Sequence, residues 1–222
     1  MEIARQSASS SRILSHRMGA IKIRKTMSDA DRLFGPGTVS EVFTSEEISE
    51  RVAELGRALT TEYRDRSPVM VGIMKGSVCF LADLVRNMDL EMEIEFLALK
   101  RYREGAYVGI AMDLFTDIGG RDVIVVMDMV DTGFNLDAIH QLLRERAPAS
   151  IATVALLDRR VRRLMEVPLE YRGFEVGYDF LVGYGLDWDG RYRGLPSIWA
   201  VLDRSALETD PHLLDRHVFA ER

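Results

Sequence analysis

Cysteine is nearly absent from this 222-residue sequence, which contains only Cys79. A disulfide within the chain is therefore excluded, and so is a cysteine-rich metal site. Histidine is scarce too: there are four, and none pairs at metal-ligand spacing outside the polar C-terminal tail, so we expect no zinc site. No apolar run approaches the roughly 18 residues of a membrane-spanning helix, so we expect no membrane partner.

An excess of basic charge is also lacking. The chain has 29 Lys and Arg against 35 Asp and Glu, a net charge of -6 and a pI near 5.3. This balance argues against a dominant nucleic-acid surface. With 47% hydrophobic and 29% charged residues, the composition is that of an ordinary globular protein. The length allows one large domain, or one domain with a small appendage.

Residues 1–26 differ from the rest because they carry six bases, one acid and a serine cluster. A transit-like segment has this composition. The alternatives are a disordered tail or a start codon placed too early, with Met18 or Met27 as the true start, and we favour these two. We therefore assign residues 1–38 to a poorly ordered extension and residues 39–222 to one globular domain.

Helical and strand patterns alternate through the globular part, which predicts an α/β fold with a doubly wound parallel sheet. A long polar segment at 102–117 breaks this alternation and is typical of a functional lid. Helices are expected at 44–63, 78–88 and 136–146, and strands at 69–74, 93–99, 123–126, 151–157, 171–176, 180–184 and 198–202.

The most informative segment is residues 123–136, VIVVMDMVDTGFNL. Its apolar run predicts a buried parallel strand, which the acids Asp128 and Asp131 end. The carboxyl ends of such strands open into the crevice where α/β sheets bind ligands. Thr132 and Gly133 then lead into a helix, whose N-terminus attracts anions. Carboxylates beside a phosphate site indicate a phosphorylated sugar as the ligand.

Two further strand ends are expected at the same edge of the sheet, Lys75-Gly76-Ser77 and Asp158-Arg159. Neither a G-x-G-x-x-G string nor a P-loop occurs, which argues against a dinucleotide-binding protein or a nucleoside triphosphatase.

Taken in order, these strings resemble the type I phosphoribosyltransferase family. Residues 123–136 are similar to its phosphoribosyl pyrophosphate signature, and 71–77, VGIMKGS, to its pyrophosphate loop. The segments 156–159, LLDR, and 182–187, VGYGLD, resemble the purine-contacting parts of the hypoxanthine/guanine branch, and 191–196, RYRGLP, follows with that branch's spacing. The match runs from about residue 42 to 202. It implies a core domain, a small hood subdomain built partly from the C-terminal region, and a flexible lid loop.

The resemblance also implies a reaction and a set of roles. The 5-phosphoribosyl group of phosphoribosyl pyrophosphate would pass to hypoxanthine or guanine, giving IMP or GMP and pyrophosphate. Asp131 would be the general base at the purine, and Asp128 would meet the ribose hydroxyls. The 5′-phosphate would be held by a loop of four residues, Thr132, Gly133, Phe134 and Asn135.

Further roles follow from the same resemblance. Lys75, Gly76, Arg193 and the lid residue Tyr102 would contact the pyrophosphate side, with a cis peptide expected between Lys75 and Gly76. Arg159, Phe180, Leu181 and Asp187 would surround the purine, and Asp187 would also face Mg2+ carried by pyrophosphate. The family further implies a homodimer or homotetramer and a cytoplasmic location.

Two departures keep other functions open. Met127 stands where relatives carry the first of two adjacent acids, and Arg159 replaces the lysine that reads the exocyclic oxygen of the purine. The two basic side chains are not equivalent, because arginine is longer and forked. The alternatives are a transferase with another base preference, such as xanthine or a purine analogue, and a non-catalytic phosphoribosyl pyrophosphate or nucleotide-binding regulator.

Overall fold

The computed structural model describes residues 39–101, 108–210, 212, 214–215 and 219. Its larger sheet has six strands in the order β4-β3-β2-β5-β6-β7. All neighbouring pairs are parallel except β3 with the edge strand β4. The strands are β2 (Val69–Ile73), β3 (Glu93–Arg101), β4 (Val108–Met112), β5 (Asp122–Val130), β6 (Ser150–Asp158) and β7 (Tyr171–Glu175). The predicted α/β class with a mainly parallel sheet is confirmed.

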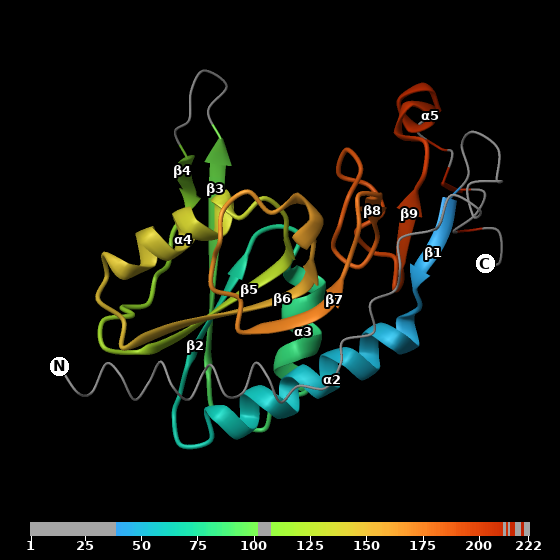
Figure 1. Ribbon diagram of the computed structural model, residues 1–222. Coiled ribbons are helices and arrows are strands. Elements are labelled where there is room, and N and C mark those ends of the chain that lie inside the picture. The colour runs from blue at the N-terminus through green and yellow to red at the C-terminus, as the bar shows by residue number, and fades with distance from the viewer. Residues whose placement is uncertain (1–38, 102–107, 211, 213, 216–218, 220–222) are drawn as a thin grey trace.

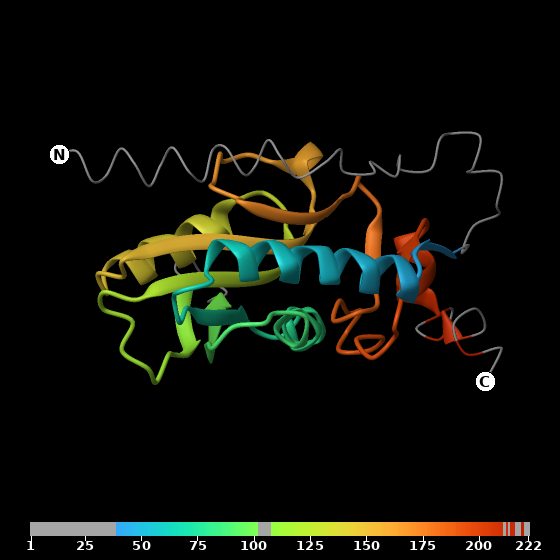
Figure 2. The same cartoon turned by 90° about the horizontal axis from the view of Figure 1, so that it is seen from below.

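Helices cover both faces of this sheet (Figures 1 and 2). On one face, α2 (Ser45–Glu62) and α3 (Val78–Arg86) pack against side chains such as Met70, Ile124 and Leu156. On the other, α4 (Phe134–Arg144) packs against Val71, Val125 and their neighbours. Alternate residues of β5 thus serve opposite cores, which explains why its stretch from Val123 to Met127 is apolar without interruption.

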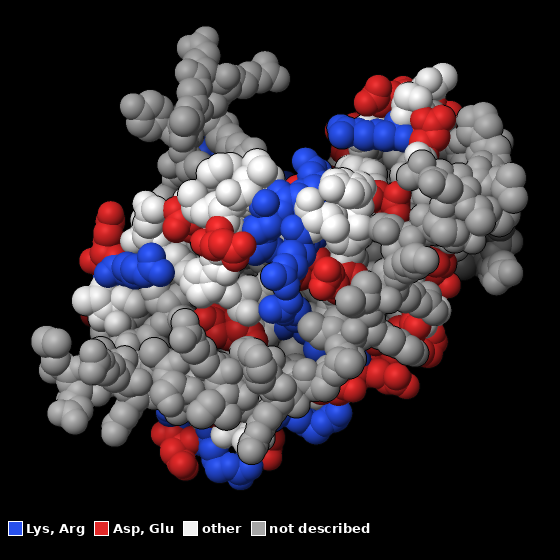
Figure 3. All heavy atoms as spheres, in the orientation of Figure 1, with Lys and Arg blue, Asp and Glu red and all other residues white. Residues whose placement is uncertain are grey.

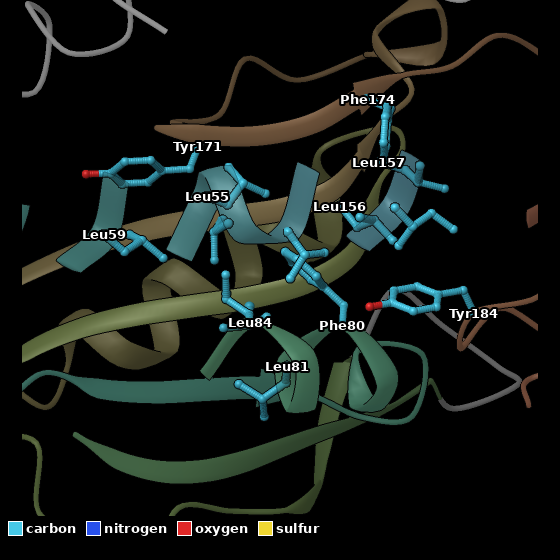
Figure 4. Close-up of a cluster of buried hydrophobic side chains, with 14 of the residues drawn as sticks. Leu55, Leu59, Phe80, Leu81, Leu84, Leu156, Leu157, Tyr171, Phe174 and Tyr184 are labelled. Atoms are coloured by element: carbon cyan, nitrogen blue, oxygen red, sulfur yellow. The ribbon is translucent and has the colours of Figure 1, made fainter. Parts of the chain in front are cut away.

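The first core is continuous from α2 to β7 (Figure 4). Leu55 and Leu59 of α2 meet Leu84 of α3, and none of the three side chains is exposed to solvent. Burying each such leucine stabilises the fold by about 1.5–3 kcal/mol. Phe43 stacks on Phe174 with ring centroids 4.2 Å apart and so joins the N-terminal strand to this core.

The start of α2 follows directly from its sequence. Thr44 accepts a hydrogen bond from the Glu47 amide, and the Glu47 carboxylate accepts one from the Thr44 amide, at 3.2 and 3.1 Å. This reciprocal capping box satisfies two amides that a helix end otherwise leaves unpaired. The predicted helix at 44–63 is confirmed to within a residue at each end.

A second, three-stranded antiparallel sheet forms the hood, with the order β1-β9-β8. Its strands are β1 (Val39–Phe43), β8 (Phe180–Val182) and β9 (Ile198–Val201), and the short helix α5 (Arg204–Thr209) follows. Figure 1 shows α2 running along the main sheet to the hood, where β1 leads into it. The hood therefore combines the first described strand with the C-terminal part of the chain.

Several elements differ from the expectation. Strand β5 continues to Val130 rather than ending at Val126, so Asp128 lies within the strand. The lid segment predicted at 102–117 contributes β4, which pairs antiparallel with β3. Strand β1 and helix α5 were not predicted. In the described part of the chain, no helix is long and apolar enough to cross a membrane.

Candidate active site

A polar cavity of about 310 Å³ opens where the carboxyl ends of β2 and β5 face the hood. Six of the predicted site residues line it: Lys75, Gly76, Asp128, Asn135, Asp187 and Arg193. Residues from four separate parts of the sequence thus converge on one space, as expected for the crevice at the carboxyl ends of parallel strands. Met127 is also part of the wall, and its side chain packs into the core at 5% exposure.

The loop after β2 approaches the cavity with no room for a side chain at Gly76. A Cβ there would lie 1.6 Å from Asp128 Oδ2, and one at Gly185 would lie 2.0 Å from the Gly76 carbonyl oxygen. The expected cis peptide at Lys75–Gly76 is wrong, because the cis bond joins Met74 to Lys75. Gly76 is required by the close approach of Asp128, and the peptide that precedes it is not the cis bond.

Asp128 is a half-buried carboxylate at the centre of this wall. Its Oδ1 accepts a hydrogen bond from the Met129 amide at 2.7 Å. Burial raises the pKa of Asp128, and the negative charge of Asp187 adds to that rise, while the Met129 amide and Arg193 oppose it. A hydroxyl of a ligand at this wall would supply a hydrogen bond to a carboxylate that burial has partly removed from water.

Asp187 and Arg193 form an ion pair on the hood side of the cavity. The Arg193 Nη2 lies 2.6 Å from Asp187 Oδ1, and its Nη1 donates to the Gly185 carbonyl at 2.6 Å. The other oxygen, Asp187 Oδ2, accepts from the Gly190 amide at 2.7 Å. Both side chains are about 30% exposed, so they remain accessible to an anionic ligand and its counterion.

The predicted phosphate loop leads into α4. Gly133 precedes the first helical residue, Phe134, with a φ of 98°, and no side chain caps the helix there. The helix N-terminus carries a partial positive charge suited to a phosphate. The loop is braced from the other side, because the Leu164 and Met165 amides donate to the Thr132 carbonyl at 3.0 and 3.1 Å.

Asp131 and Arg159 lie side by side beyond this loop. The Arg159 Nη1 is 4.0 Å from Asp131 Oδ2, and the exposed Arg162 approaches the same oxygen at 3.4 Å. Among the described residues, Asp131 Oδ1 and Arg159 Nε are buried without any hydrogen-bond partner. Burial also lowers the pKa of the Arg159 guanidinium, an effect that Asp131 opposes. An unpaired acceptor atom and an unpaired donor atom therefore belong to two neighbouring side chains.

Arg163 shapes this region in a way that the sequence did not reveal. Its Nε donates to the Asp131 carbonyl at 3.0 Å, and its Nη2 pairs with the buried carboxylate of Asp158. The arginine thereby fixes the backbone that carries Asp131 to the end of β6. The run of arginines at 159–163 was visible in the sequence, but nothing in it distinguished Arg163, whose side chain is 10% exposed, from the exposed Arg160 and Arg162.

Basic side chains gather in a band on the face between the main sheet and the hood (Figure 3). The loop after β6 contributes Arg160 and Arg162, which are exposed, in the turn Arg160–Arg162. A local positive surface on a chain of net charge -6 favours the approach of anions to this side.

The remaining predicted residues belong to the hood and the lid. Phe180 is half-buried at the start of β8, and Leu181, opposite Ala200 of β9, is 6% exposed. The Asp179 carbonyl accepts a hydrogen bond from Arg159 Nη2 at 2.8 Å, which joins the hood to the Asp131 region. Tyr102 lies outside the described residues.

Comparisons with known proteins agree with this geometry. The model of the phosphoribosyl transferase domain matches residues 38–189. The hypoxanthine-guanine phosphoribosyltransferase of Dictyostelium discoideum is 42% identical over 70% of this chain and 91% of its own. The hypoxanthine phosphoribosyltransferase of Escherichia coli K12 is 40% identical over 74% and 96%.

Solved structures give the same result. A hypoxanthine phosphoribosyltransferase from Staphylococcus aureus superposes with a TM-score of 0.71 at 36% identity, covering 73% of this chain and 90% of that one. A ternary substrates complex of the Trypanosoma cruzi enzyme gives 0.70 at 32% identity, covering 74% and 95%. The chain therefore belongs to the phosphoribosyltransferase family, and it resembles the hypoxanthine and hypoxanthine-guanine enzymes over most of its length.

Proposed function

We propose that the protein is a purine-salvage transferase that moves the 5-phosphoribosyl group of phosphoribosyl pyrophosphate to hypoxanthine or guanine. The products are IMP or GMP and pyrophosphate. The identity to enzymes named for this activity supports the proposal. A cytoplasmic location and a homo-oligomeric state stay predictions from the resemblance.

The observation that carries the proposal is the adjacent unpaired pair, Asp131 Oδ1 and Arg159 Nε. Leaving a buried polar group unsatisfied costs about 1–3 kcal/mol, so a ligand that satisfies both gains affinity and orientation. The imidazole edge of a 6-oxopurine offers an N–H beside a carbonyl oxygen. The N–H suits the carboxylate, and the carbonyl suits the guanidinium. Adenine carries an amino group in place of that carbonyl and would set donor against donor.

In the proposed reaction, a nitrogen of the base attacks the anomeric carbon of the ribose while the bond to pyrophosphate breaks. Asp131 takes the proton from the other imidazole nitrogen, so no positive charge accumulates on the purine. Arg163 donates to the Asp131 carbonyl at 3.0 Å and so keeps this catalytic residue in place. Arg193 stabilises the charge that develops on the leaving pyrophosphate.

The sugar phosphate would bind across the cavity at the β2 and β5 ends. Asp128 would accept hydrogen bonds from ribose hydroxyls, and the turn at Thr132 and Gly133 would hold the 5′-phosphate. The loop at Lys75 and Gly76 would meet the pyrophosphate through its backbone and its ammonium group.

The carboxylate groups at the cavity wall fit a magnesium ion that arrives with the substrate. In the described residues, no group of three or more His, Cys, Asp or Glu could form a metal cage. Mg2+ is commonly held by one or two carboxylates together with substrate phosphates. Asp187 at the cavity wall provides one such carboxylate. The bound ion would neutralise pyrophosphate and make it a better leaving group.

A second candidate differs in the base. Arg159 is buried at 5% exposure and uses Nη2 on the Asp179 carbonyl, so its fork is fixed in orientation. A guanidinium fixed in orientation donates hydrogen bonds to a base differently from the flexible ammonium group of a lysine. The site could therefore prefer xanthine or a purine analogue. The third possibility is a non-catalytic regulator, which the buried, uncharged Met127 in the cavity wall favours.

A spectrophotometric assay with four bases distinguishes the three candidate functions. Hypoxanthine, guanine, xanthine and adenine are each supplied with phosphoribosyl pyrophosphate and Mg2+. We expect turnover with hypoxanthine and guanine, and none with adenine. A preference for xanthine that Arg159→Lys reverses would favour the second candidate, with the exposed neighbour substitution Arg160→Lys as control. Binding of the sugar phosphate without turnover of any base would favour the regulator.

A further inference from the structure

The C-terminal segment beyond the matched domain is built into the hood. The domain match ends at residue 189, whereas α5, which follows β9 (Figure 1), and Leu214 pack on β8 and β9. Leu207 and Leu214 are fully buried in a cluster with Val182 and Val201. The Tyr192 hydroxyl donates to Asp215 Oδ1 at 2.9 Å. Apolar burial of Leu207 therefore holds α5 against β8 and β9, and the hydrogen bond ties Asp215, beyond α5, to the loop between these strands.

Arg204, the first residue of α5, lies against two aromatic rings. Its Cζ atom is 5.4 Å from the ring centroid of Phe180 and 5.4 Å from that of Trp188. The two rings meet edge to face, with centroids 5.4 Å apart and an interplanar angle of 85°. The guanidinium and the two rings thus form a three-membered cluster, called here the aromatic clamp. Each contact has the geometry of a favourable cation–π or aromatic pair.

We propose that Arg204 is a positioning residue for purine binding, acting through Phe180. This rests on the proposed function and on the role that the family resemblance implies for Phe180, which is to stack on the base. A half-exposed phenylalanine ring must be ordered when a flat ligand stacks on it, and that ordering weakens binding. Arg204 lies over the ring and Trp188 packs against it in a T-shaped pair, so the ring is ordered before the base arrives. In this proposal the purine stacks on the face of the ring opposite Arg204.

Apart from the aromatic clamp, the contacts of Arg204 contribute little to the stability of the fold. Its side chain is 63% exposed, and its ion pair with Glu208 is long, at 3.9 Å. Exposed pairs of this kind contribute little to stability. The anchoring of α5 comes from Leu207 instead, which is fully buried. Removing the guanidinium should therefore leave the hood folded and alter only the two rings that it contacts.

Steady-state kinetics of the full chain test the proposal. We expect Arg204→Ala to raise the KM for hypoxanthine and guanine about two- to five-fold, the range given by an exposed cation–π contact. The KM for phosphoribosyl pyrophosphate should not change, because Arg204 does not line the cavity of Lys75 and Asp128. Arg204→Lys should restore most of the purine affinity, since an ammonium can also lie over the ring. Glu208→Gln, which removes only the ion pair, should match the parent.

Two results would overturn the proposal. A lower purine KM in Arg204→Ala would mean that the guanidinium occupies the face the base needs. Equal changes in both KM values, or no change in either, would remove any specific role at the purine.

Fluorescence of Trp188 gives a second measurement that does not need turnover. The chain has two tryptophans, so Trp199→Phe leaves Trp188 as the single reporter beside Phe180. Titration with IMP should change its emission, and Arg204→Ala should weaken the apparent affinity by the same two- to five-fold. Equal affinity with and without Arg204 would sink the positioning role alone. A parent chain that neither binds IMP nor turns over any base would sink the proposed function as well.

Discussion

Replacing Asp131 by asparagine isolates the proton-accepting role of this residue. An asparagine oxygen can keep the contacts with Arg162 and Arg159, which lie 3.4 and 4.0 Å from Asp131 Oδ2. The amide nitrogen then takes the place of the buried, unpaired Oδ1. It cannot accept a proton, and it turns a donor toward the N–H of the base. We expect kcat to fall at least about 100-fold, which corresponds to ~2.7 kcal/mol on the barrier.

Binding of phosphoribosyl pyrophosphate should change far less, by less than about three-fold, because Asp131 does not line the cavity of Lys75, Asp128 and Arg193. Single-turnover kinetics would report the chemical step, and calorimetric titration the affinity. Asp137→Asn is a matched control, since that side chain accepts a hydrogen bond from Gln141 on the exposed side of α4. Equal turnover of Asp131→Asn and the parent would refute the general-base role.

Three other changes test separate parts of the site and fold. Gly76→Ala should raise the KM for phosphoribosyl pyrophosphate at least about ten-fold and lower the free energy of unfolding by about 1–3 kcal/mol. The reason is that the added Cβ would lie 1.6 Å from Asp128 Oδ2. The control Gly194→Ala places its Cβ within 4 Å of no other group and should change neither quantity. Met127→Glu should change the Mg2+ dependence of that KM without abolishing activity; an inert parent rescued by this change would show that Asp128 alone is insufficient. Burial lowers the pKa of His140 to about 4, so the unfolded chain binds more protons than the folded one between pH 6.5 and 4. The free energy of unfolding therefore falls by about 3 kcal/mol as the pH drops through that window. Denaturant unfolding of His140→Gln should show a smaller fall, and a pH dependence identical to that of the parent would contradict this.

Much of the fold was predictable because its cues are local. The helix start near Thr44 and the apolar run of β5 each depend on residues near in sequence, and both elements were predicted, although β5 extends to Val130 instead of ending at Val126. Strand β1 was missed because its partner is β9, whose Val201 pairs with Val39 across the length of the domain. No periodicity in five residues reveals a partner so distant in the chain.

In the candidate site, too, local features were predictable and tertiary contacts were not. Glycine at position 76 signalled a special backbone, but the sequence could not tell a cis peptide from the close approach of Asp128 that the structure has. Arg163 and Arg162 looked alike in one basic loop, yet the first is buried against the Asp131 carbonyl and the second is exposed beside its carboxylate. Such distinctions depend on tertiary packing, because identical side chains differ only in what surrounds them.

The most direct test of the central claim is a measurement of both products from one reaction. Hypoxanthine, phosphoribosyl pyrophosphate and Mg2+ are mixed with the protein, and IMP and pyrophosphate are quantified over time. We predict that the two appear in equal amounts and at the same rate, with both lost in Asp131→Asn. Binding of phosphoribosyl pyrophosphate with no IMP formed from hypoxanthine, and no GMP from guanine, would contradict the account.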